Sequence, residues 1–543
     1  MKLTRITAAL SATAIAAALA GCGATTTLTG STGESTTATV SAATATAGAS
    51  VEAVLADNQE SHATADDLAY DEADVVDVTL SGSTATADGA GVDVDSATVT
   101  ITGPGTYRLA GTLTGQVVVD SDSEGVVRVV LDGASISSPS TSAIAVMAAD
   151  EAVVLLADGS TNTLADGTTY GDEEGEANAA LYSAADLTIA GGGSLEVTGN
   201  ANDGIGAQDG LVVSGGTVTV EAVDDGIRGK DYVRLEGGEV RVTARGDALK
   251  SDNAEEGDRG YVAVLGGTVT ATAGDDGISA ASDVVVGGGT LTITATGDGI
   301  HGDVSATIGG GTTTVTESNE GLEAKVVTIA DGTLSITSTD DGINVSDGSG
   351  GGGPAGGPGG GQPQGGPSTT AGGLSLTISG GTTTVDADGD GLDSGGDVTV
   401  TGGTTVVSGP TGDGNGALDV DGAFLVSGGT LAAAGSSGMA VAPDADSEQG
   451  WVSATFDSAY PAGTVVQVVS GDEVVATWTA DKPFASVVLS SAGITAGESY
   501  TVDVGGTASG TAVGGLTLGG STTGATELGA VTAGEHTGGR GRP

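Results

Sequence analysis

The chain is poor in basic residues, aromatic residues and cysteine. Its 543 residues include 15 Lys and Arg against 71 Asp and Glu, which gives a formal net charge of −56. Nucleic acid is therefore disfavoured as a partner, because binding its phosphates requires basic residues. Cys22 is the single cysteine, so an intrachain disulfide is excluded. With only 2 Trp, 3 Phe and 8 Tyr, the chain cannot build its core from large rings.

Small residues are abundant instead, and they recur at a fixed period between residues 186 and 345. A Gly-Gly pair, replaced by Asp-Gly at 331–332, recurs at steps of 23, 22, 29, 22, 22 and 21 residues. An acidic residue followed by Gly or Ala and an aliphatic residue recurs at steps of 22, 22, 29, 22, 22 and 21. Such self-similarity is typical of a solenoid. These acidic turns start at Asp203, Asp225, Asp247, Asp276, Asp298, Glu320 and Asp341.

Each repeat predicts three short strands. In the run 217–222, between the Gly pair and the acidic turn, polar and apolar residues alternate, as in a strand with one buried face. Runs such as 211–214 and 227–230 predict two more strands per repeat. No window in the repeats shows a sustained helical period. We therefore predict an all-β parallel β-helix of about 22 residues per coil, with successive coils about 4.8 Å apart.

The first residues predict export and lipid attachment. Lys2 and Arg5 precede a short apolar segment, 6–20, which is too short for a permanent membrane span and is typical of a secretory signal. The sequence Leu-Ala-Gly-Cys that follows resembles a bacterial lipobox, so residues 1–22 are predicted as a lipoprotein signal with Cys22 as the lipidation site. A stray thiol in an ordinary signal is the alternative. The expected location is the outer face of the cell membrane, with the lipid as the only membrane contact.

Composition predicts the remaining boundaries. Residues 23–65, rich in Thr, Ser and Ala, predict a flexible linker, and the β-helix is expected at 66–440. A Gly/Pro-rich stretch at 348–373 predicts a disordered insertion, after which the Gly pairs resume. Residues 441–520 alternate like antiparallel strands and contain both tryptophans, so we expect them to cap the open end of the solenoid. Residues 521–543 are predicted as a flexible tail, and the protein is expected to be a monomer.

The acidic turns would form a column of carboxylates if the coils stack in register. Neighbours about 4.8 Å apart would repel by roughly 1 kcal/mol in water and about 3.5 kcal/mol at an effective dielectric constant of 20. Ca²⁺ prefers oxygen ligands and is the expected counterion; alternatively, the acids extend into solvent or cap backbone amides in the turns. The predicted calcium ligands are Asp203, Asp224, Asp225, Asp247, Asp275, Asp276, Asp298, Asp340 and Asp341.

Other metal patterns are weak, and basic residues beside the column are few. The chain has no EF-hand loop, and its three histidines are too scattered in the sequence to predict a zinc site. Four basic residues follow the acidic turns closely, and they are predicted as ligand contacts or, alternatively, as counterions of the column. These residues are Arg228, Lys230, Lys250 and Lys325.

The repeats resemble a known family. Gly-Asp-Asp-Gly-Ile at 274–278, Gly-Gly-Thr-Val-Thr-Val at 215–220 and Asp-Ala-Leu-Lys-Ser at 247–251 are similar to units of the secreted bacterial carbohydrate-binding β-helix proteins. The segment 451–506 is similar to that family's C-terminal end. The resemblance covers residues 95–506 and implies a right-handed parallel β-helix, bound Ca²⁺, and affinity for plant-type polysaccharides such as cellulose and polygalacturonate. The family is also similar in fold to pectate lyases, which use Ca²⁺ and a basic residue.

Three functions remain open at this point. A polysaccharide-binding surface lipoprotein is favoured, because binding requires only the Ca²⁺ bridge and the neighbouring donors. A calcium-dependent polysaccharide lyase would need a Lys or Arg as base. No Ser-His-Asp or clear paired-carboxylate arrangement is evident, so no catalytic residue is assigned. A structural or adhesive stalk would need no ligand.

Overall fold

The computed structural model describes residues 45–170, 177–347 and 373–536. The predicted signal, Cys22, and residues 348–372 of the predicted insertion lie outside these ranges. The described residues fall in one compact unit and are almost entirely β, with one short α-helix, α1 (Val51–Asp57), and one 3-10 turn, η1 (Glu72–Asp74). Among them, no helix has the length and apolar character needed to cross a membrane.

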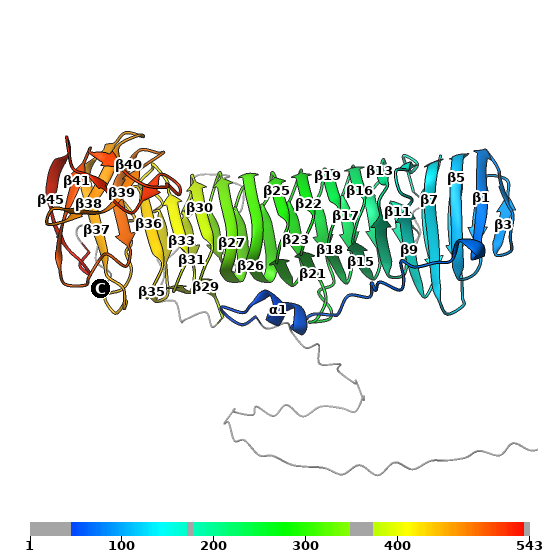
Figure 1. The fold of residues 1–543 in the computed structure, drawn as a ribbon, viewed down its shortest axis with the longest axis horizontal. Helices are drawn as coiled ribbons and strands as arrows, with labels where there is room; N and C mark the ends of the chain where they lie inside the picture. Colours follow the sequence, from blue (N-terminus) through cyan, green and yellow to red (C-terminus); the bar gives the residue numbers. More distant parts are fainter. Residues whose placement is uncertain (1–44, 171–176, 348–372, 537–543) are drawn as a thin grey trace, which may run out of the picture. The chain divides into compact units, whose positions relative to one another are not determined.

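Each strand of the repeats pairs in parallel with a strand of the next repeat. The strand β16 (Thr217–Ala222) pairs with β19 (Glu239–Ala244), β17 (Ile227–Gly229) with β20 (Leu249–Ser251), and β18 (Tyr232–Leu235) with β21 (Tyr261–Val264). Three ladders of parallel strands therefore run along the unit (Figure 1). The all-β prediction is confirmed, and the mostly parallel pairing is consistent with a β-helix.

The three ladders define three faces. The threonine face contains β10 (Thr161–Ala165), β13 (Ser194–Gly199), β16, β19, β22 (Thr268–Ala273), β25 (Thr290–Thr294), β30 (Thr382–Ala387), β33 (Thr404–Ser408) and β36 (Thr430–Gly435). The charged face contains β11 (Ala179–Ser183), β14 (Asp203–Ala207), β17, β20, β23 (Ile278–Ala280), β28 (Ile343–Val345), β31 (Leu392–Ser394) and β34 (Leu418–Val420). The covered face contains β9 (Glu151–Leu156), β12 (Leu187–Gly191), β15 (Gly210–Val213), β18, β21, β24 (Asp283–Val286), β29 (Ser375–Ile378), β32 (Asp397–Val400) and β35 (Phe424–Val426).

Two long strands contribute to all three faces. The strands β26 (Ile300–Glu317) and β27 (Leu322–Ser338) pair with each other in parallel along most of their length. The stack starts with β1 (Val75–Gly82), β5 (Gly105–Thr114) and β7 (Val126–Ser137), which pair in parallel. Short strands complete this end: β2 (Ala85–Ala87), β3 (Val92–Asp95), β4 (Thr98–Ile101), β6 (Gln116–Asp120) and β8 (Ile144–Ala148).

The core between the faces is a stack of small aliphatic side chains. In β16, Val218 and Val220 are buried while Thr217 and Glu221 are exposed, as the alternation predicted. The second glycine of the Gly pairs has a left-handed backbone, with φ of 85° at Gly216, a conformation that costs glycine little. The glycine of an acidic turn is needed for a different reason. A Cβ on Gly226 would lie 2.7 Å from the carbonyl oxygen of Ala248 in the next coil.

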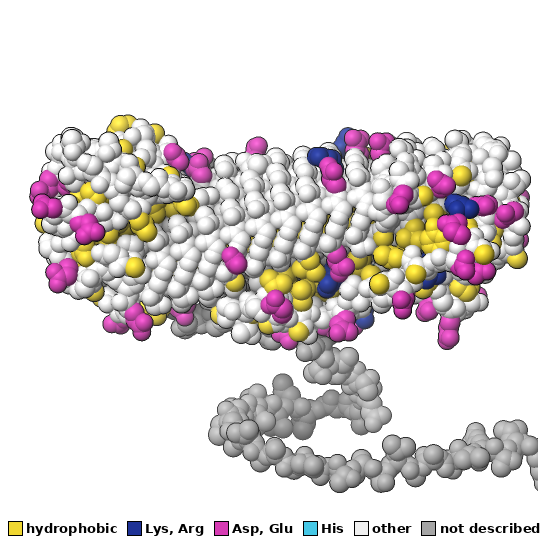
Figure 2. Space-filling view, viewed as in Figure 1, with side chains coloured by type: hydrophobic (Ala, Val, Ile, Leu, Met, Phe, Trp, Pro, Cys, Tyr) yellow, Lys and Arg dark blue, Asp and Glu magenta, His cyan; other side chains and the backbone are white. Residues whose placement is uncertain are grey.

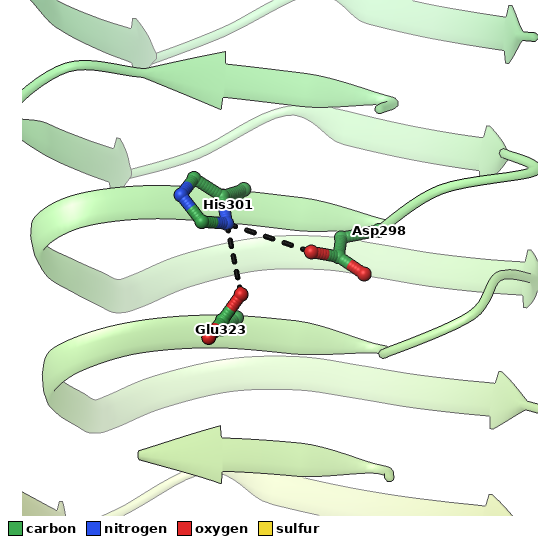
Figure 3. A group of neighbouring side chains, drawn as sticks. All are labelled: Asp298, His301 and Glu323. Atoms are coloured by element: carbon green, nitrogen blue, oxygen red, sulfur yellow. Dashed lines mark hydrogen bonds and ion pairs between the residues drawn. The ribbon is translucent and has the colours of Figure 1, made fainter. Parts of the chain in front are cut away.

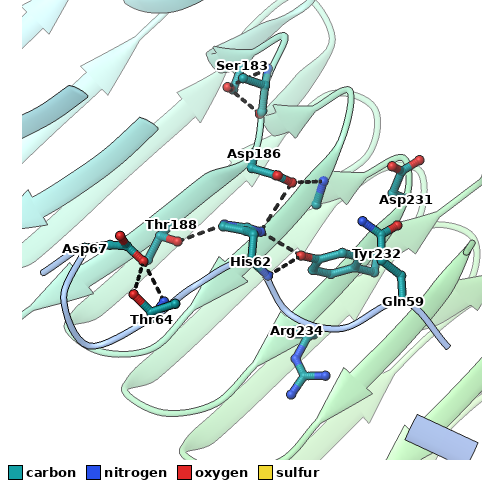
Figure 4. Close-up of polar contacts among 12 residues, drawn as sticks. Gln59, His62, Thr64, Asp67, Ser183, Asp186, Thr188, Asp231, Tyr232 and Arg234 are labelled. Atoms are coloured by element: carbon teal, nitrogen blue, oxygen red, sulfur yellow. Dashed lines mark hydrogen bonds and ion pairs between the residues drawn. The ribbon is translucent and has the colours of Figure 1, made fainter. Parts of the chain in front are cut away.

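Residues 45–74, which we name the strap, lie along the covered face against the direction of the coils. Gly48 donates its N–H to Thr328 Oγ1, and the Asn58 amide donates to Asp283 Oδ2 at 2.8 Å. Further along the strap, the His62 N–H donates to Tyr232 Oη (Figure 4), and the Asp67 carbonyl accepts from the Arg128 guanidinium. The partners thus lie progressively earlier in the stack. The predicted flexible linker is therefore wrong for residues 45–65.

Apolar contacts explain why the strap is ordered. On β15, Leu211 and Val213 point into the core, whereas Val212 packs outward with Val54 of α1, Tyr232 and Tyr261. A second apolar group under the strap contains Val130, Val153, Leu155 and Ala190 with Leu68 of the strap packed against them. Figure 2 shows hydrophobic side chains gathered along the course of the strap. Burial of these outward-facing side chains offsets the entropy cost of ordering the strap.

The C-terminal strands are antiparallel. The strand β40 (Phe484–Ser490) pairs with β37 (Trp451–Tyr460) and also with β36, so the last strand of the threonine ladder has no free edge there. A five-stranded sheet follows, in the order β43 (Leu516–Thr517), β39 (Glu473–Thr479), β38 (Val465–Ser470), β41 (Ser499–Val504) and β45 (Thr526–Thr532). The strands β42 (Thr507–Ala508) and β44 (Gly520–Ser521) form a separate pair.

One predicted boundary at this end is wrong. The flexible tail was expected from residue 521, but β45 pairs with β41 and buries Val531. The alternating sequence of β45 is short and rich in small residues, and for this reason its composition resembles that of a flexible tail. Residues 537–543 lie outside the described ranges.

Candidate functional site

The acidic turns stack into a column at the corner between the threonine face and the charged face. The acidic column comprises Asp203, Asp225, Asp247, Asp276, Asp298, Glu320, Asp341 and Asp390. Within it, a carboxylate oxygen of each aspartate that precedes another member accepts a hydrogen bond from the backbone N–H of that next member. The Asp247 N–H lies 2.9 Å from Asp225 Oδ1, and the Asp298 N–H lies 2.8 Å from Asp276 Oδ1. The amide-capping interpretation is therefore correct for these turns, and each such hydrogen bond uses only one of the two carboxylate oxygens.

A second row of side chains runs beside the column, three residues further along the chain in each coil. The strand register aligns these residues at the centres of successive charged-face strands. This outer row comprises Arg228, Lys250, Ser279, His301, Glu323, Asn344, Asp393 and Asp419. Its chemistry changes along the stack, from basic in the early coils to acidic in the late ones.

In the early coils, basic side chains already neutralise the column. Lys250 Nζ lies 3.0 Å from Asp225 Oδ2 and 2.9 Å from Asp247 Oδ2. Arg228 instead pairs with Asp252 at 2.7 Å. Burial opposes the charge of Lys250, but hydrogen bonds to Asp247 and Asp225 outweigh it and raise the pKa of the ammonium above its usual value. Lys250 is thus a counterion of the column, the alternative that the sequence left open, whereas the ion-pair partner of Arg228 lies outside the column.

The other two predicted ligand contacts are placed differently. Lys230 follows Arg228 and Gly229 at the end of a charged-face strand, and Lys325 lies two residues after Glu323 in β27. Neither side chain forms an ion pair within the described part of the chain. They remain available to an external ligand.

The predicted calcium ligands of the early coils do come together. Asp203, Asp224 and Asp225 offer oxygens within 4.8 Å of one another, and so do Asp247, Asp275 and Asp276. Because Lys250 contacts one oxygen of Asp225 and one of Asp247, a cation there would compete with an ammonium that is already in place. These two groups therefore fit Ca²⁺ poorly.

The late coils carry an acidic group without such a counterion. Asp341, Asp390 and Asp393 offer oxygens within 4.8 Å of one another. Burial and then the neighbouring carboxylates raise the pKa of Asp341 to about 6, of Asp390 to about 6 and of Asp393 to about 7. Among the described residues, no Lys, Arg or His forms an ion pair with these three. Lys482, the next basic residue after them in the sequence, pairs with Asp386 and Asp388 instead.

Asp390 and Asp393 were missed in the sequence, although a signal was present. The residues Asp390, Gly391 and Leu392 repeat the acidic turn after the insertion, just as the Gly pairs resume there. Predicted ligand Asp340 lies next to Asp341 and contributes to raising the pKa of Asp390. The late acidic group, which we define as Asp341, Asp390 and Asp393, takes two residues from the column and one from the outer row. It fits Ca²⁺ best, because all its donors are hard oxygens and no basic side chain among the described residues pairs with them.

A histidine occupies the middle of the outer row. His301 Nδ1 lies 3.5 Å from Asp298 Oδ2 and 3.0 Å from Glu323 Oε2 (Figure 3). His301 Nε2 lies 3.2 Å from Asp303 Oδ1. Hydrogen bonds to Asp298, Asp303 and Glu323 raise the pKa of His301 to about 12. Predicted calcium ligand Asp298 therefore belongs to a mixed nitrogen and oxygen site.

Parts of this chain are similar in sequence to known proteins. A family described as carbohydrate-binding domain-containing protein matches residues 95–348. A carbohydrate-binding domain-containing protein of Acetivibrio thermocellus is 44% identical over 188 residues, which are 34% of this chain and 66% of that relative. The match thus spans just under two thirds of the relative's length. A solved structure, the polysaccharide lyase-like protein from C. thermocellum as a gadolinium derivative, is 32% identical with a TM-score of 0.40, and the match covers 47% of this chain and 96% of that one.

Proposed function

We propose that this protein binds polysaccharides at the cell surface through Ca²⁺ held by the late acidic group. The observation that carries the proposal is the convergence of Asp341, Asp390 and Asp393 without a basic partner among the described residues. The similarity of residues 95–348 to a carbohydrate-binding domain supports a polysaccharide as the ligand. The proposal includes a right-handed β-helix of about 22 residues per coil, a lipid anchor at Cys22 and a monomeric state.

The late acidic group has the properties that such a site requires. Its three carboxylates are half-buried, and burial together with neighbouring carboxylates raises the pKa of each, so ionising all of them at neutral pH is costly. A bound Ca²⁺ would supply positive charge there and could share its coordination with a carboxylate of an acidic sugar. Backbone amides orient two of the ligands, because Asp341 Oδ1 accepts from the Asp390 N–H at 2.6 Å and Asp390 Oδ1 accepts from the Gly416 N–H.

Binding without catalysis is favoured over a lyase. A lyase base must lose its proton near neutral pH, so its pKa should be lowered. The pKa of Lys250 and that of Arg228 are both raised, because hydrogen bonds to carboxylates outweigh burial. Neither residue is therefore suited to remove a proton from a uronic sugar.

Glycan binding with and without Ca²⁺ tests the proposal. We expect polygalacturonate to bind in Ca²⁺ and to be released by EDTA, and the double variant Asp390→Asn/Asp393→Asn to lose this binding. A matched control, Asp122→Asn/Glu124→Gln, removes two exposed charges far away in sequence and should bind like the parent protein. Binding to acidic glycans that persists in EDTA would contradict the calcium bridge, and absence of binding to any glycan would favour a structural stalk.

A further inference from the structure

Asp298, His301 and Glu323 form a cluster whose chemistry differs from that of the rest of the column. The register of β26 and β27 places His301 directly beside Glu323, and Asp298 precedes β26 in the acidic column. Their three facing atoms, His301 Nδ1, Asp298 Oδ2 and Glu323 Oε2, lie within 4.8 Å of one another (Figure 3). The side chains of His301, Asp298 and Glu323 are 27%, 15% and 15% exposed, so the cluster is mostly buried but still open to solvent.

We propose that these three side chains bind a transition-metal ion, with Zn²⁺ as the preferred ion. One imidazole nitrogen and two carboxylate oxygens are donors typical of zinc and related divalent metals, whereas Ca²⁺ takes oxygen ligands. The remaining coordination position would hold water or an external ligand. This site is separate from the late acidic group, and it does not depend on the function proposed above.

The atoms that do not face the metal position are all held by neighbours. Asp298 Oδ1 accepts from the Glu320 N–H at 3.2 Å, and Glu323 Oε1 accepts from Ser346 Oγ at 2.6 Å. His301 Nε2 lies 3.2 Å from Asp303 Oδ1. A metal-bound histidine usually donates its second ring N–H to a carboxylate, which fixes the ring and its tautomer. The ligand atoms are thus oriented before an ion arrives.

There is also space beside the cluster. A cavity of about 40 Å³ is lined by His301, Asp303, Glu323 and Lys325, together with neighbouring residues. A water molecule needs at least roughly 10–15 Å³ of such volume. The cavity therefore allows a water molecule or a small ligand group near the proposed ion, and the Lys325 side chain in its wall could contact an anionic one.

The competing arrangement is a protonated His301 that acts as a counterion, as Lys250 does in the earlier coils. The two cases differ chemically because Lys250 cannot become a ligand while it keeps its proton, whereas imidazole loses one proton from Nδ1 when that nitrogen binds Zn²⁺. The sequence suggested no zinc site because the histidines are scattered, but here the other two ligands are acidic residues from adjacent coils.

Metal uptake by the full-length, metal-stripped protein tests this site. Equilibrium dialysis against Zn²⁺ in excess Ca²⁺ should load a single high-affinity Zn²⁺ per chain, and Co²⁺ should give the absorption bands of a bound low-coordinate ion. His301→Asn should abolish both signals. Asp303→Asn keeps all three ligands and should weaken Zn²⁺ binding by about 10- to 100-fold. The control His536→Asn should bind like the parent protein.

The melting temperatures of the same variants provide a second measurement in case one of them folds poorly. Zn²⁺ should raise the melting temperature of the parent and of His536→Asn, but not that of His301→Asn. If Zn²⁺ does not bind, if Ca²⁺ displaces it at similar concentration, or if the His301→Asn and Asp303→Asn variants bind Zn²⁺ as tightly as the parent, the proposal is overturned. In each of those cases His301 serves as a counterion only.

Discussion

At the scale of the residue, each column aspartate has two separate roles. One oxygen accepts a backbone hydrogen bond from the next coil, and the other carries charge toward the outer row. Asp276 illustrates this, since its Oδ1 accepts from the Asp298 N–H at 2.8 Å. Burial, with the neighbouring carboxylates, raises the pKa of Asp276 to about 7. The hydrogen bond stabilises the turn, whereas the charge destabilises it when no cation is present.

Substitutions at Asp276 should separate these roles. Asp276→Asn keeps an acceptor oxygen and removes the charge, so we expect unchanged or higher stability in metal-free buffer at neutral pH. Asp276→Ala leaves the Asp298 N–H without its acceptor and should cost about 1–3 kcal/mol. Urea denaturation of both variants measures the difference. Equal destabilisation by both would show that the charge, and not the acceptor, supports the turn.

Lys250 is predicted to be the strongest single counterion in the column. Lys250→Met leaves Asp225 and Asp247, whose side chains are 8% and 6% exposed, without their shared cation. Removing one partner of a buried ion pair costs about 3–5 kcal/mol, and the partial exposure of Lys250 should reduce this. Added Ca²⁺ should restore part of the loss, because the two carboxylates then become free ligands.

Lys230→Met is the matched control, since the Lys230 side chain has no ion-pair partner in the described residues. It should change stability by less than about 0.5 kcal/mol. Chemical denaturation with and without Ca²⁺ measures both variants. If Lys250→Met is as stable as the control, the ammonium does not neutralise the column.

At the scale of the element, the strap adds a pH-dependent contact to the covered face. His62 Nε2 lies 2.9 Å from Thr188 Oγ1, and Nδ1 lies 2.7 Å from Tyr232 Oη and 3.3 Å from Asp186 Oδ1 (Figure 4). Burial lowers the pKa of His62 to about 4 and outweighs the attraction of Asp67 and Glu236. The neutral ring is therefore the form that fits this position.

Acid should release the strap. The unfolded or detached strap has a histidine with an ordinary pKa near 6.5, so it takes up protons before the docked strap does. The contribution of His62 should be complete above about pH 6.5 and should decrease as the pH falls toward 4. Hydrogen exchange of residues 50–70 should accelerate over this range, and His62→Gln should reduce the dependence. Uniform protection down to pH 4 would contradict this.

The covered-face strands carry a sequence signal for the strap. The runs at 211–213 and 284–286 are continuously apolar, unlike the alternating run at 217–222. A strand covered on both sides has such a run, so these residues signal that something lies over this face. The sequence of the strap itself gives little indication, because its few apolar residues are separated by small and polar ones.

At the scale of the whole molecule, Ca²⁺ should stabilise the fold from the late coils. A ligand that binds only the folded state stabilises it by about 2.7 kcal/mol when its concentration is 100 times the dissociation constant. We expect Ca²⁺ to raise the melting temperature of the parent protein and EDTA to reverse the effect. In Asp390→Asn/Asp393→Asn the increase should be lost, while the Asp122→Asn/Glu124→Gln control should keep it. Identical melting curves in Ca²⁺ and EDTA would contradict the proposed site.

The sequence by itself determined the all-β class, the repeat, the glycine corners and the column of acids. These follow from local periodicity, since strands, tight turns and in-register stacking are encoded within each repeat of about 22 residues. Only the tertiary structure decided which acids have a counterion, because Lys250 and His301 act on residues of their own and neighbouring coils. It also decided that the strap is ordered, because that depends on apolar side chains contributed by coils far away in the sequence.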